Sequence, residues 1–186
     1  FFDDVDPALL GWKSLAVNLS DLAAMGAQPV GFTLALALPS VDEDWLGAFS
    51  RGLLDLAARH DCELLGGDTT RGPLAIGITI FGHVPPEQAL RRDRGRAGDD
   101  LWVSGELGSA ALAVRERLAG MALPAEHPAR ARLERPSPSS ASPSAAKRFF
   151  CCSVCDSSSC ICASSRSAVP ISSPRPDGVM MRLVSS

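Results

Sequence analysis

What the sequence lacks excludes several classes of protein. No apolar run approaches the roughly 20 residues of a membrane-spanning helix, and the chain does not open with the basic and then apolar pattern of a secretory leader. Its 18 basic residues do not outnumber its 21 acidic ones, so charge gives no reason to expect nucleic acid or a membrane surface as a partner. We therefore expect a cytoplasmic protein.

Cysteine is scarce in the regularly patterned part of the chain. Of six cysteines, five crowd into residues 151–162 and only Cys62 lies elsewhere, which is not the distribution of a disulfide framework. A structural zinc site would need two well-spaced pairs, and Cys160 and Cys162 are too close together to form the second pair. We expect no metal site in this cluster.

Two common nucleotide-binding loops are also missing. The sequence contains neither Gly-x-x-x-x-Gly-Lys-Ser/Thr nor Gly-x-Gly-x-x-Gly, and the first absence excludes a P-loop kinase. No Ser-His-Asp or Cys-His combination can be assembled, and His60 and His83 are expected to be structural. The residues alone therefore assign no catalytic side chain.

What the sequence does contain is a run at 64–73 that passes from leucines through two glycines to polar residues. It predicts a short buried strand at 62–65 that ends where the glycines let the backbone approach a partner closely. Asp68 follows with two threonines, and a carboxylate beside hydroxyls suits Mg²⁺ and the phosphates that it carries. The alternative is a tight turn in which Asp68 bonds to nearby backbone.

Hydrophobic periodicity predicts a fold that contains both helices and strands. Apolar residues recur with a helical period in some segments and alternate in others. We expect, in order, helix 7–25, strand 30–38, helix 41–60, strand 62–65, strand 74–84, strand 101–104 and helix 109–118. Asp6 and Pro7 mark the start of the first helix and Gly26 its end. Ser40 with Glu43 forms a capping box for the second helix.

Strands 30–38 and 74–84 are weakly polar on both faces, which indicates a sheet that is covered on both sides. The two helices can cover one face. The other would be covered either by the same face of a second copy, giving a homodimer, or by chain that this sequence does not include.

Asp21 is the second candidate for a functional carboxylate. It falls in the last turns of an apolar helix. A negative charge there interacts unfavourably with the helix dipole, which lowers stability by about 0.3–1 kcal/mol. An unfavourable local choice of this kind is typical of functional sites, and a divalent cation would neutralise it. Together, Asp21 and Asp68 could bind Mg²⁺ ions that hold nucleotide phosphates. The alternative is that Asp21 is simply solvated.

The chain divides into three parts by composition. Residues 1–86 form the first domain. Residues 87–136 begin with a polar linker and continue into the first elements of a second α+β domain; Arg91, Arg92, Arg94 and Arg96 lie in the linker and are either solvated or, for one of them, in contact with phosphate. Residues 137–186 are rich in Ser, Pro, Ala and Cys, and no packed core is expected there.

Several motifs resemble those of the thiamine-monophosphate kinases. They are residues 6–7, 11–13 and 16–27 (which include Asn18-Leu19-Ser20-Asp21), residues 65–73 (Leu-Gly-Gly-Asp-Thr-Thr-Arg-Gly-Pro), and residues 98–105. The likeness runs from residue 1 to about residue 138. That family belongs with aminoimidazole ribonucleotide synthetase and selenophosphate synthetase. The resemblance implies an α+β N-terminal domain with a mixed or antiparallel sheet, helices on one face of the sheet and dimerisation through the other.

The resemblance implies Mg²⁺-assisted transfer of the γ-phosphoryl group of ATP to thiamine monophosphate, without a covalent enzyme intermediate. Carried over by position, Asp21 and Asp68 are expected Mg²⁺ ligands. Gly67, Asp68 and Arg92 are expected to bind ATP. A homodimer is implied as well.

The chain departs from the family at both ends. The family has a His-Phe pair at this chain's start, paired aspartates before it, and a Ser-Asp-Gly segment downstream that is missing here. We expect an incomplete kinase, inactive by itself, whose tail after about residue 138 is an out-of-frame reading. The alternatives are an ATP-dependent synthetase of the purine or selenophosphate type and a non-catalytic dimerisation module.

Overall fold

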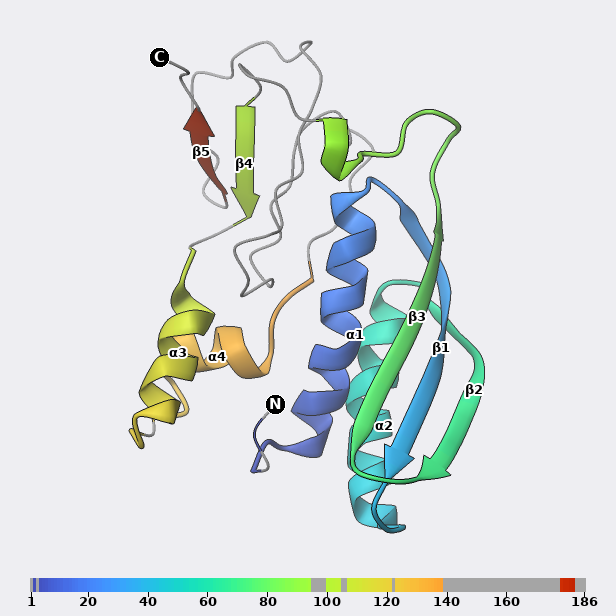
Figure 1. Ribbon diagram of the computed structural model, residues 1–186, viewed down its shortest axis with the longest axis vertical. Coiled ribbons are helices and arrows are strands. Elements are labelled where there is room, and N and C mark those ends of the chain that lie inside the picture. Colours follow the sequence, from blue (N-terminus) through green and yellow to red (C-terminus); the bar gives the residue numbers. More distant parts are fainter. Residues whose placement is uncertain are drawn as a thin grey trace.

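The computed structural model describes residues 2, 4–94, 100–104, 107–121, 123–138 and 178–182, with the backbone alone for 100–104 and 178–182. Their elements are, in chain order, α1 (Pro7–Ala24), β1 (Gln28–Leu38), α2 (Glu43–Arg59), β2 (Glu63–Arg71), β3 (Ala75–His83), the 3₁₀ helix η1 (Arg92–Arg94), β4 (Asp100–Ser104), α3 (Ser109–Leu118), α4 (Pro128–Glu134) and β5 (Gly178–Arg182) (Figure 1). None of the described helices is long and apolar enough to cross a membrane.

The first helix has the ends that its sequence predicts. The carboxylate of Asp6 accepts hydrogen bonds from the backbone N–H of Ala8 at 2.7 Å and of Leu9 at 3.3 Å, and Pro7 occupies the first helical position. Beyond the helix, Gly26 has φ 74°, a conformation that glycine adopts without strain. The expected range of 7–25 is therefore confirmed to within one residue.

The capping box expected for the second helix is wrong. The N-cap of α2 is Asp42, not Ser40, and its carboxylate accepts from the N–H of Trp45 at 2.9 Å. Asp42 is as good a cap as serine and stands closer to the apolar stripe of the helix, so the helix begins two residues later. Glu43 lies in the first turn, where its charge favours the helix dipole.

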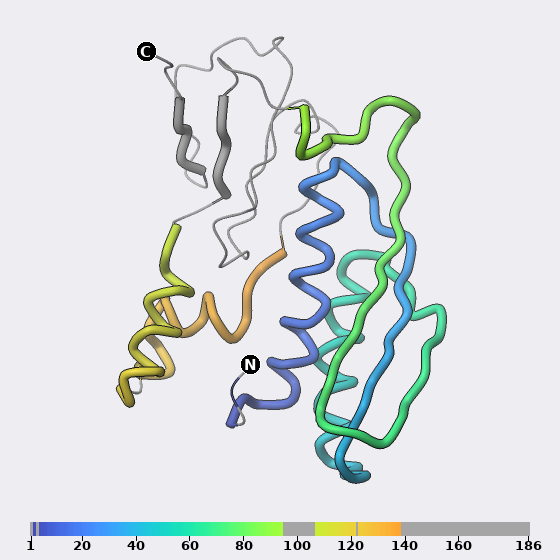
Figure 2. Tube along the Cα trace, in the orientation of Figure 1, coloured from blue at the N-terminus to red at the C-terminus, as the bar shows by residue number. Residues whose placement is uncertain are grey.

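The first three strands form one sheet in the order β2-β1-β3, with β1 parallel to β2 and antiparallel to β3. This confirms the predicted mixed sheet. Helices α1 and α2 pack together and against the same face, as Figures 1 and 2 show. The core between them contains Leu10, Trp12, Leu15, Ala16, Leu19, Phe32, Phe49, Leu53, Leu56, Ala57 and Cys62.

Two glycines set the close approach of α1 and α2. A Cβ atom on Gly11 would lie 2.1 Å from the carbonyl oxygen of Phe49, and one on Gly52 would lie 1.9 Å from that of Ala8. Real Cβ atoms do not come so near to backbone oxygen, so any larger residue at either position would push the helices apart. The helix pair is therefore fixed against the sheet.

The opposite face of the sheet is left open by the residues that the structure describes. Along β1, Leu34 and Leu36 point to the helices, so Thr33 and Ala35 point the other way. On β3, Thr79 and Phe81 share that open face, and Phe81 is 46% exposed. The sheet therefore has one covered and one uncovered face, as the strand composition predicts for a single copy.

The C-terminal elements form two smaller groups. Strand β4 pairs with β5 in antiparallel register, and α3 packs on α4 around Ala113, Ala129 and Leu133. Strand 101–104 and helix 109–118 are confirmed, whereas α4 was not predicted. Strand β5 lies within residues 137–186, for which the expectation of no packed core stays a prediction; the cysteine cluster at 151–162 lies outside the described residues.

Candidate functional site

The predicted end of a strand at residue 65 is wrong. Strand β2 continues through the glycines and polar residues to Arg71, so Asp68 lies inside a strand rather than at its exit or in a tight turn. The reason is tertiary: β1 offers a parallel partner along the whole segment, from Gly31 opposite Glu63 to Leu38 opposite Arg71. Hydrogen bonding to β1 outweighs the local preference of Gly and Asp for turns.

The two glycines of β2 serve this pairing. The register of β1 and β2 shifts between Phe32 and Thr33, and Gly66 and Gly67 accommodate the shift with φ values of 152° and 151°. A Cβ atom on Gly67 would lie 1.9 Å from the carbonyl oxygen of Leu34. Gly67 therefore lets β2 reach β1, which is a close approach of the kind that the sequence indicates, but to a neighbouring strand.

Asp68 lies on the uncovered face of the sheet. It pairs in register with Ala35, which in turn pairs with Gly77 of β3. Because paired residues of neighbouring strands point to the same side, the Asp68 side chain points away from the helices. It is exposed, and its carboxylate is free to meet solvent, a cation or a partner.

Asp21 lies on the opposite side of the domain, in the last turn of α1. Its backbone carbonyl accepts from the N–H of Met25 at 3.2 Å, and its side chain is exposed. The last turn of α1 contains no basic residue that would offset the charge of Asp21 against the helix dipole. The carboxylate that the sequence indicates therefore has no compensating charge in the last turn of its own helix.

The single chain does not bring Asp21 and Asp68 together. No Cα atom of α1 lies within 8 Å of a Cα atom of β2. Ala35, the partner of Asp68, is seven residues along β1 from Gln28, where the strand begins after α1. That is about 23 Å at roughly 3.3 Å per residue. The assignment of each aspartate to Mg²⁺ stays a prediction, and the described residues contain no cluster of three or more His, Cys, Asp or Glu side chains that could hold a metal.

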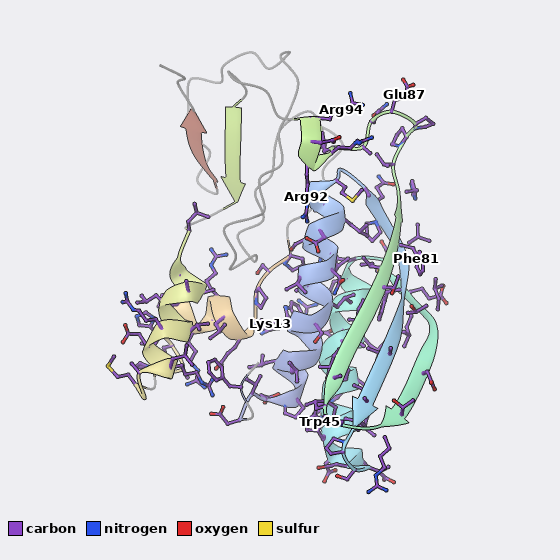
Figure 3. The ribbon with its side chains drawn as sticks, in the orientation of Figure 1. Lys13, Trp45, Phe81, Glu87, Arg92 and Arg94 are labelled. Carbon is purple, nitrogen blue, oxygen red and sulfur yellow. The ribbon has the colours of Figure 1, made fainter. Side chains whose placement is uncertain are left out.

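Arg92, in contrast, comes to the same end of the domain as Asp21. The backbone N–H of Leu90 donates to the carbonyl of Met25 at 3.0 Å, which ties the start of the arginine-rich segment to the end of α1. Figure 3 shows Arg92 close to that helix end. The structure therefore places an exposed carboxylate and an exposed guanidinium, 71 positions apart in the sequence, at the same end of the first domain.

Among the described arginines of this segment, Arg91 is already paired. Its guanidinium donates to both carboxylate oxygens of Asp93, at 2.9 and 2.7 Å. This hydrogen bonding raises the pKa of Arg91 and lowers the pKa of Asp93. Arg91 is thus committed to a local ion pair, which leaves Arg92 and Arg94 as the described candidates for a phosphate. Arg96 lies outside the described residues.

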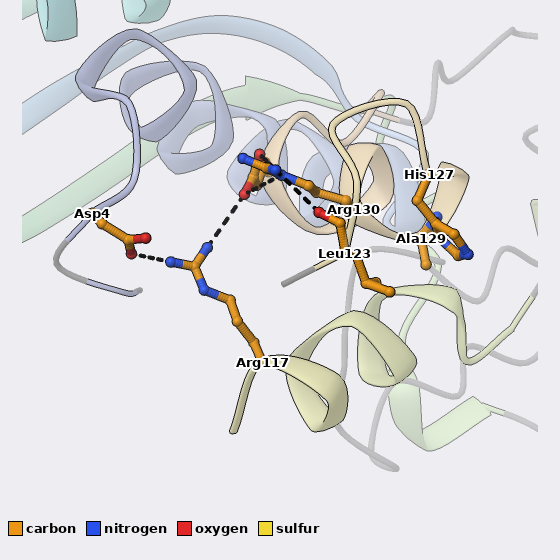
Figure 4. Close-up of polar contacts among 7 residues, drawn as sticks. Asp4, Arg117, Leu123, His127, Ala129 and Arg130 are labelled. Atoms are coloured by element: carbon orange, nitrogen blue, oxygen red, sulfur yellow. Dashed lines mark hydrogen bonds and ion pairs between the residues drawn. The ribbon is translucent and has the colours of Figure 1, made fainter. Parts of the chain in front are cut away.

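A second polar cluster, which sequence reasoning missed, joins α3 and α4 to the start of the chain (Figure 4). The guanidinium of Arg117 donates to Asp4 and, at 3.3 Å, to Glu134, and it lies 4.2 Å from the ring centre of Phe2. Arg130 donates to both oxygens of Glu134 at 3.0 Å. Because Arg117 is 113 residues from Asp4, only the fold could reveal this cluster.

The cluster borders a cavity of about 240 Å³ between the N-terminal end of α1 and the helix pair α3–α4. Its lining consists of Phe2, Val5, Leu10, Lys13, Val114, Arg117, Leu133 and Glu134. The lining is mostly apolar, and the charges of Arg117 and Glu134 are paired with each other. Because these two charges are paired with each other, the described lining of the cavity gives no indication of a ligand site.

His60 and Cys62 have environments that suit structural roles. Burial lowers the pKa of His60, Arg59 lowers it further, and Asp61 opposes them. Burial raises the pKa of the Cys62 thiol, which keeps it protonated and unreactive. The expectation that His60 is structural agrees with its position at the C-cap of α2.

Comparison with known proteins shows which family the first domain resembles. Residues 1–84 match the family described as AIR synthase related protein, N-terminal domain. The match covers the two helices α1 and α2 and the three-stranded sheet. The α+β fold class predicted from the sequence is thereby confirmed, with helices on one face of the sheet.

Several curated thiamine-monophosphate kinases have sequences that are highly identical to part of this chain. The enzyme of Salmonella typhimurium is 54% identical over 111 residues and that of Escherichia coli K12 is 55% identical over 111 residues; each match covers 60% of this chain and 34% of the relative. The resemblance drawn from the motifs is therefore confirmed. The chain spans about a third of the length of these relatives.

Solved structures of thiamine-monophosphate kinases have a similar fold. Thiamine-monophosphate kinase from Stenotrophomonas maltophilia superposes with a TM-score of 0.69 and 51% identity, covering 74% of this chain and 46% of the other. A structure of AaThiL in complex with AMPPCP and TMP superposes with a TM-score of 0.66 and 28% identity, covering 74% and 45%. The hydrogenase maturation protein HypE, at 24% identity and a TM-score of 0.58, shares the fold alone.

Proposed function

We propose that this chain is part of a thiamine-monophosphate kinase, which transfers the γ-phosphoryl group of ATP to thiamine monophosphate and forms thiamine diphosphate. The observation that carries the proposal is identity of more than half of the residues over 111 positions with kinases of that name. The AaThiL complex, which holds both AMPPCP and TMP, supports ATP and thiamine monophosphate as the two ligands.

We propose Mg²⁺ as the metal on the chemistry of the available donors. Asp21 and Asp68 are exposed carboxylates, and carboxylate oxygens are the ligands that Mg²⁺ prefers. Bound Mg²⁺ would supply charge neutralisation between two anionic reactants. Arg92 would hold a phosphate of ATP beside Asp21, and the Gly67 backbone together with Asp68 would contact ATP from β2. None of these residues forms a covalent bond in the proposed reaction.

The positions of the two aspartates indicate whether one chain or a dimer would be the catalytic unit. Because Asp21 and Asp68 lie on opposite sides of one chain, we propose that they bind different ions and that a homodimer, rather than the single chain, is the catalytic unit. The uncovered sheet face supports this proposal, since it exposes Phe81 and Leu65, of which 46% and 56% of the surface is accessible. Packing two such faces together would bury both side chains.

Thermal unfolding with and without ligands tests the proposal. The chain, extended to the length of its relatives, should be stabilised by thiamine monophosphate together with AMPPCP and Mg²⁺, and should form thiamine diphosphate from ATP. An aminoimidazole ribonucleotide precursor should give no shift. Stabilisation by that precursor instead of thiamine monophosphate would favour a synthetase of the same superfamily and overturn the kinase.

A second candidate is a non-catalytic dimerisation module, which the uncovered face favours directly. It predicts that the chain dimerises but binds no nucleotide. Nucleotide binding that persists in a variant unable to dimerise would count against it. We place the protein in the cytoplasm, where ATP and thiamine monophosphate would both be available.

A further inference from the structure

Trp12 makes an unusual long-range contact from the middle of the first domain. It lies on α1 within the main core and is 8% exposed. Its indole N–H donates to the carbonyl oxygen of Pro136 at 2.8 Å, across 124 positions of sequence. A buried indole N–H needs an acceptor, and among the described residues Pro136, just after α4, provides it.

Two arginines lie over the same ring. The guanidinium of Arg135 is 4.6 Å from the ring centre of Trp12, and that of Arg59 is 5.0 Å away. Arg59 comes from α2 and is held by an ion pair with Asp55 at 2.8 Å, whereas Arg135 is the C-cap residue of α4. The indole is therefore the point at which α1, α2 and the end of α4 meet.

This point differs physically from the other links between the two parts of the chain. The Arg117 cluster joins them through the Phe2 ring and through Asp4, a 77% exposed carboxylate; exposed ion pairs contribute little to stability, and this link contains no buried hydrogen bond like that of Trp12. The Trp12 contacts combine a buried hydrogen bond to Pro136 with cation–π attraction from two arginines that are themselves exposed. They are also directional, since the indole N–H can satisfy only one acceptor.

We propose that Trp12, Arg59, Arg135 and Pro136 form a latch that holds the helix pair α3–α4 against the first domain and sets its orientation. The latch is made entirely from this chain. When it opens, the indole N–H loses its acceptor and α4 loses its contact with α1, while the core under α2 keeps its other contacts. Opening is therefore a local event that need not unfold the first domain.

Hydrogen exchange of the whole chain, with peptides resolved along the sequence, tests the latch. Trp12→Phe keeps an aromatic ring but removes the donor, and Arg135→Ala removes one cation. We expect backbone exchange in residues 128–136 to become about fivefold faster in the first variant and about two- to fivefold faster in the second. Exchange in α2, which keeps most of its core contacts, should rise less than in residues 128–136 in the first variant and stay unchanged in the second.

The matched control is Arg132→Ala, which removes an exposed arginine one turn earlier on α4 and should leave exchange in residues 128–136 as it is. The double variant should exchange more slowly than the product of the single effects predicts, because both changes open the same latch. Unchanged exchange in both single variants, or an equal rise in α2 and α4, would overturn the proposal.

Discussion

The backbone N–H of Leu90 donates to the carbonyl oxygen of Met25 at 3.0 Å. This one bond attaches the arginine-rich segment to the C-terminal end of α1 and so brings Arg92 to the end of the domain that carries Asp21. Each of the two residues is ambiguous in the sequence, since each has an ordinary explanation as a solvated side chain. Because both residues lie at one helix end, we favour a shared role in which Arg92 binds a phosphate and Asp21 binds its cation.

Asp21→Asn should increase stability when Mg²⁺ is absent. The change removes a charge that opposes the dipole of α1, and the expected gain is about 0.3–1 kcal/mol. With Mg²⁺ and AMPPCP present the order should reverse, because the wild-type carboxylate gains a cation. Thermal unfolding under the two conditions measures both effects.

Asp44→Asn is the matched control for Asp21→Asn. Asp44 lies in the first turn of α2, where its charge favours the dipole, so the same chemical change should destabilise by a similar amount and should not respond to Mg²⁺. Loss of stability in Asp21→Asn without Mg²⁺ would show that the Asp21 carboxylate has a structural partner instead.

Gly67→Ala should destabilise the protein by about 2–4 kcal/mol, because the new methyl group meets the Leu34 carbonyl and the backbone has φ 151°. Gly66→Ala has the same backbone problem but no atom within 4 Å, so a loss of about 1 kcal/mol is expected. Gly72→Ala, with its nearest contact at 3.6 Å, should change stability by less than about 0.5 kcal/mol. Urea unfolding checks this ranking, and equal losses at Gly66 and Gly67 would contradict the close contact with β1.

Phe81→Asp should convert a dimer to a monomer without unfolding the domain. Figure 3 shows Phe81 on β3, and its position opposite Gly31 places it on the uncovered face. A buried unpaired charge in a face-to-face dimer would be strongly unfavourable. Sedimentation velocity measures the change in mass. Val41→Asp, at an exposed site outside the sheet, should leave the mass unchanged, and a monomeric wild-type chain would refute the prediction.

Stability should fall as the pH drops below about 6.5, the ordinary pKa of histidine, partly because of His60. Burial and Arg59 lower the pKa of His60 in the folded state. The unfolded chain therefore binds a proton more readily, and stability present above the unfolded pKa is lost as the pH falls towards the folded one. Denaturant midpoints at pH 7.5 and 5.5 should differ less in His60→Gln than in the wild type. His83→Gln, at an exposed position, should keep the full difference.

The sequence predicted the elements whose signals are local. Asp6, Pro7 and Gly26 define α1 because caps and turn residues act within one helical turn. Alternation defined β1 and β3, and burying the larger side chains placed the helices on one face. The sheet face left without a cover followed from the same pattern.

The sequence did not predict features that depend on distant pairing. Strand β2 extends six residues beyond the predicted end because β1 lies beside it, and no local pattern contains that partner. The same holds for Trp12, whose acceptor is 124 positions away. The joint site of Asp21 and Asp68 was inferred from residue chemistry and from the family resemblance, and neither contains the distance between the two residues within one chain.

The position of β2 at the edge of the sheet has a consequence for the behaviour of this chain at high concentration. Among the described strands only β1 pairs with it, so its outer row of N–H and C=O groups is available to a strand from another molecule. Glu63, Asp68 and Arg71 place charges along that edge and discourage such growth. Neutralising Asp68 would therefore remove a safeguard against fibrous self-association, and its carboxylate serves solubility whether or not a cation ever binds there.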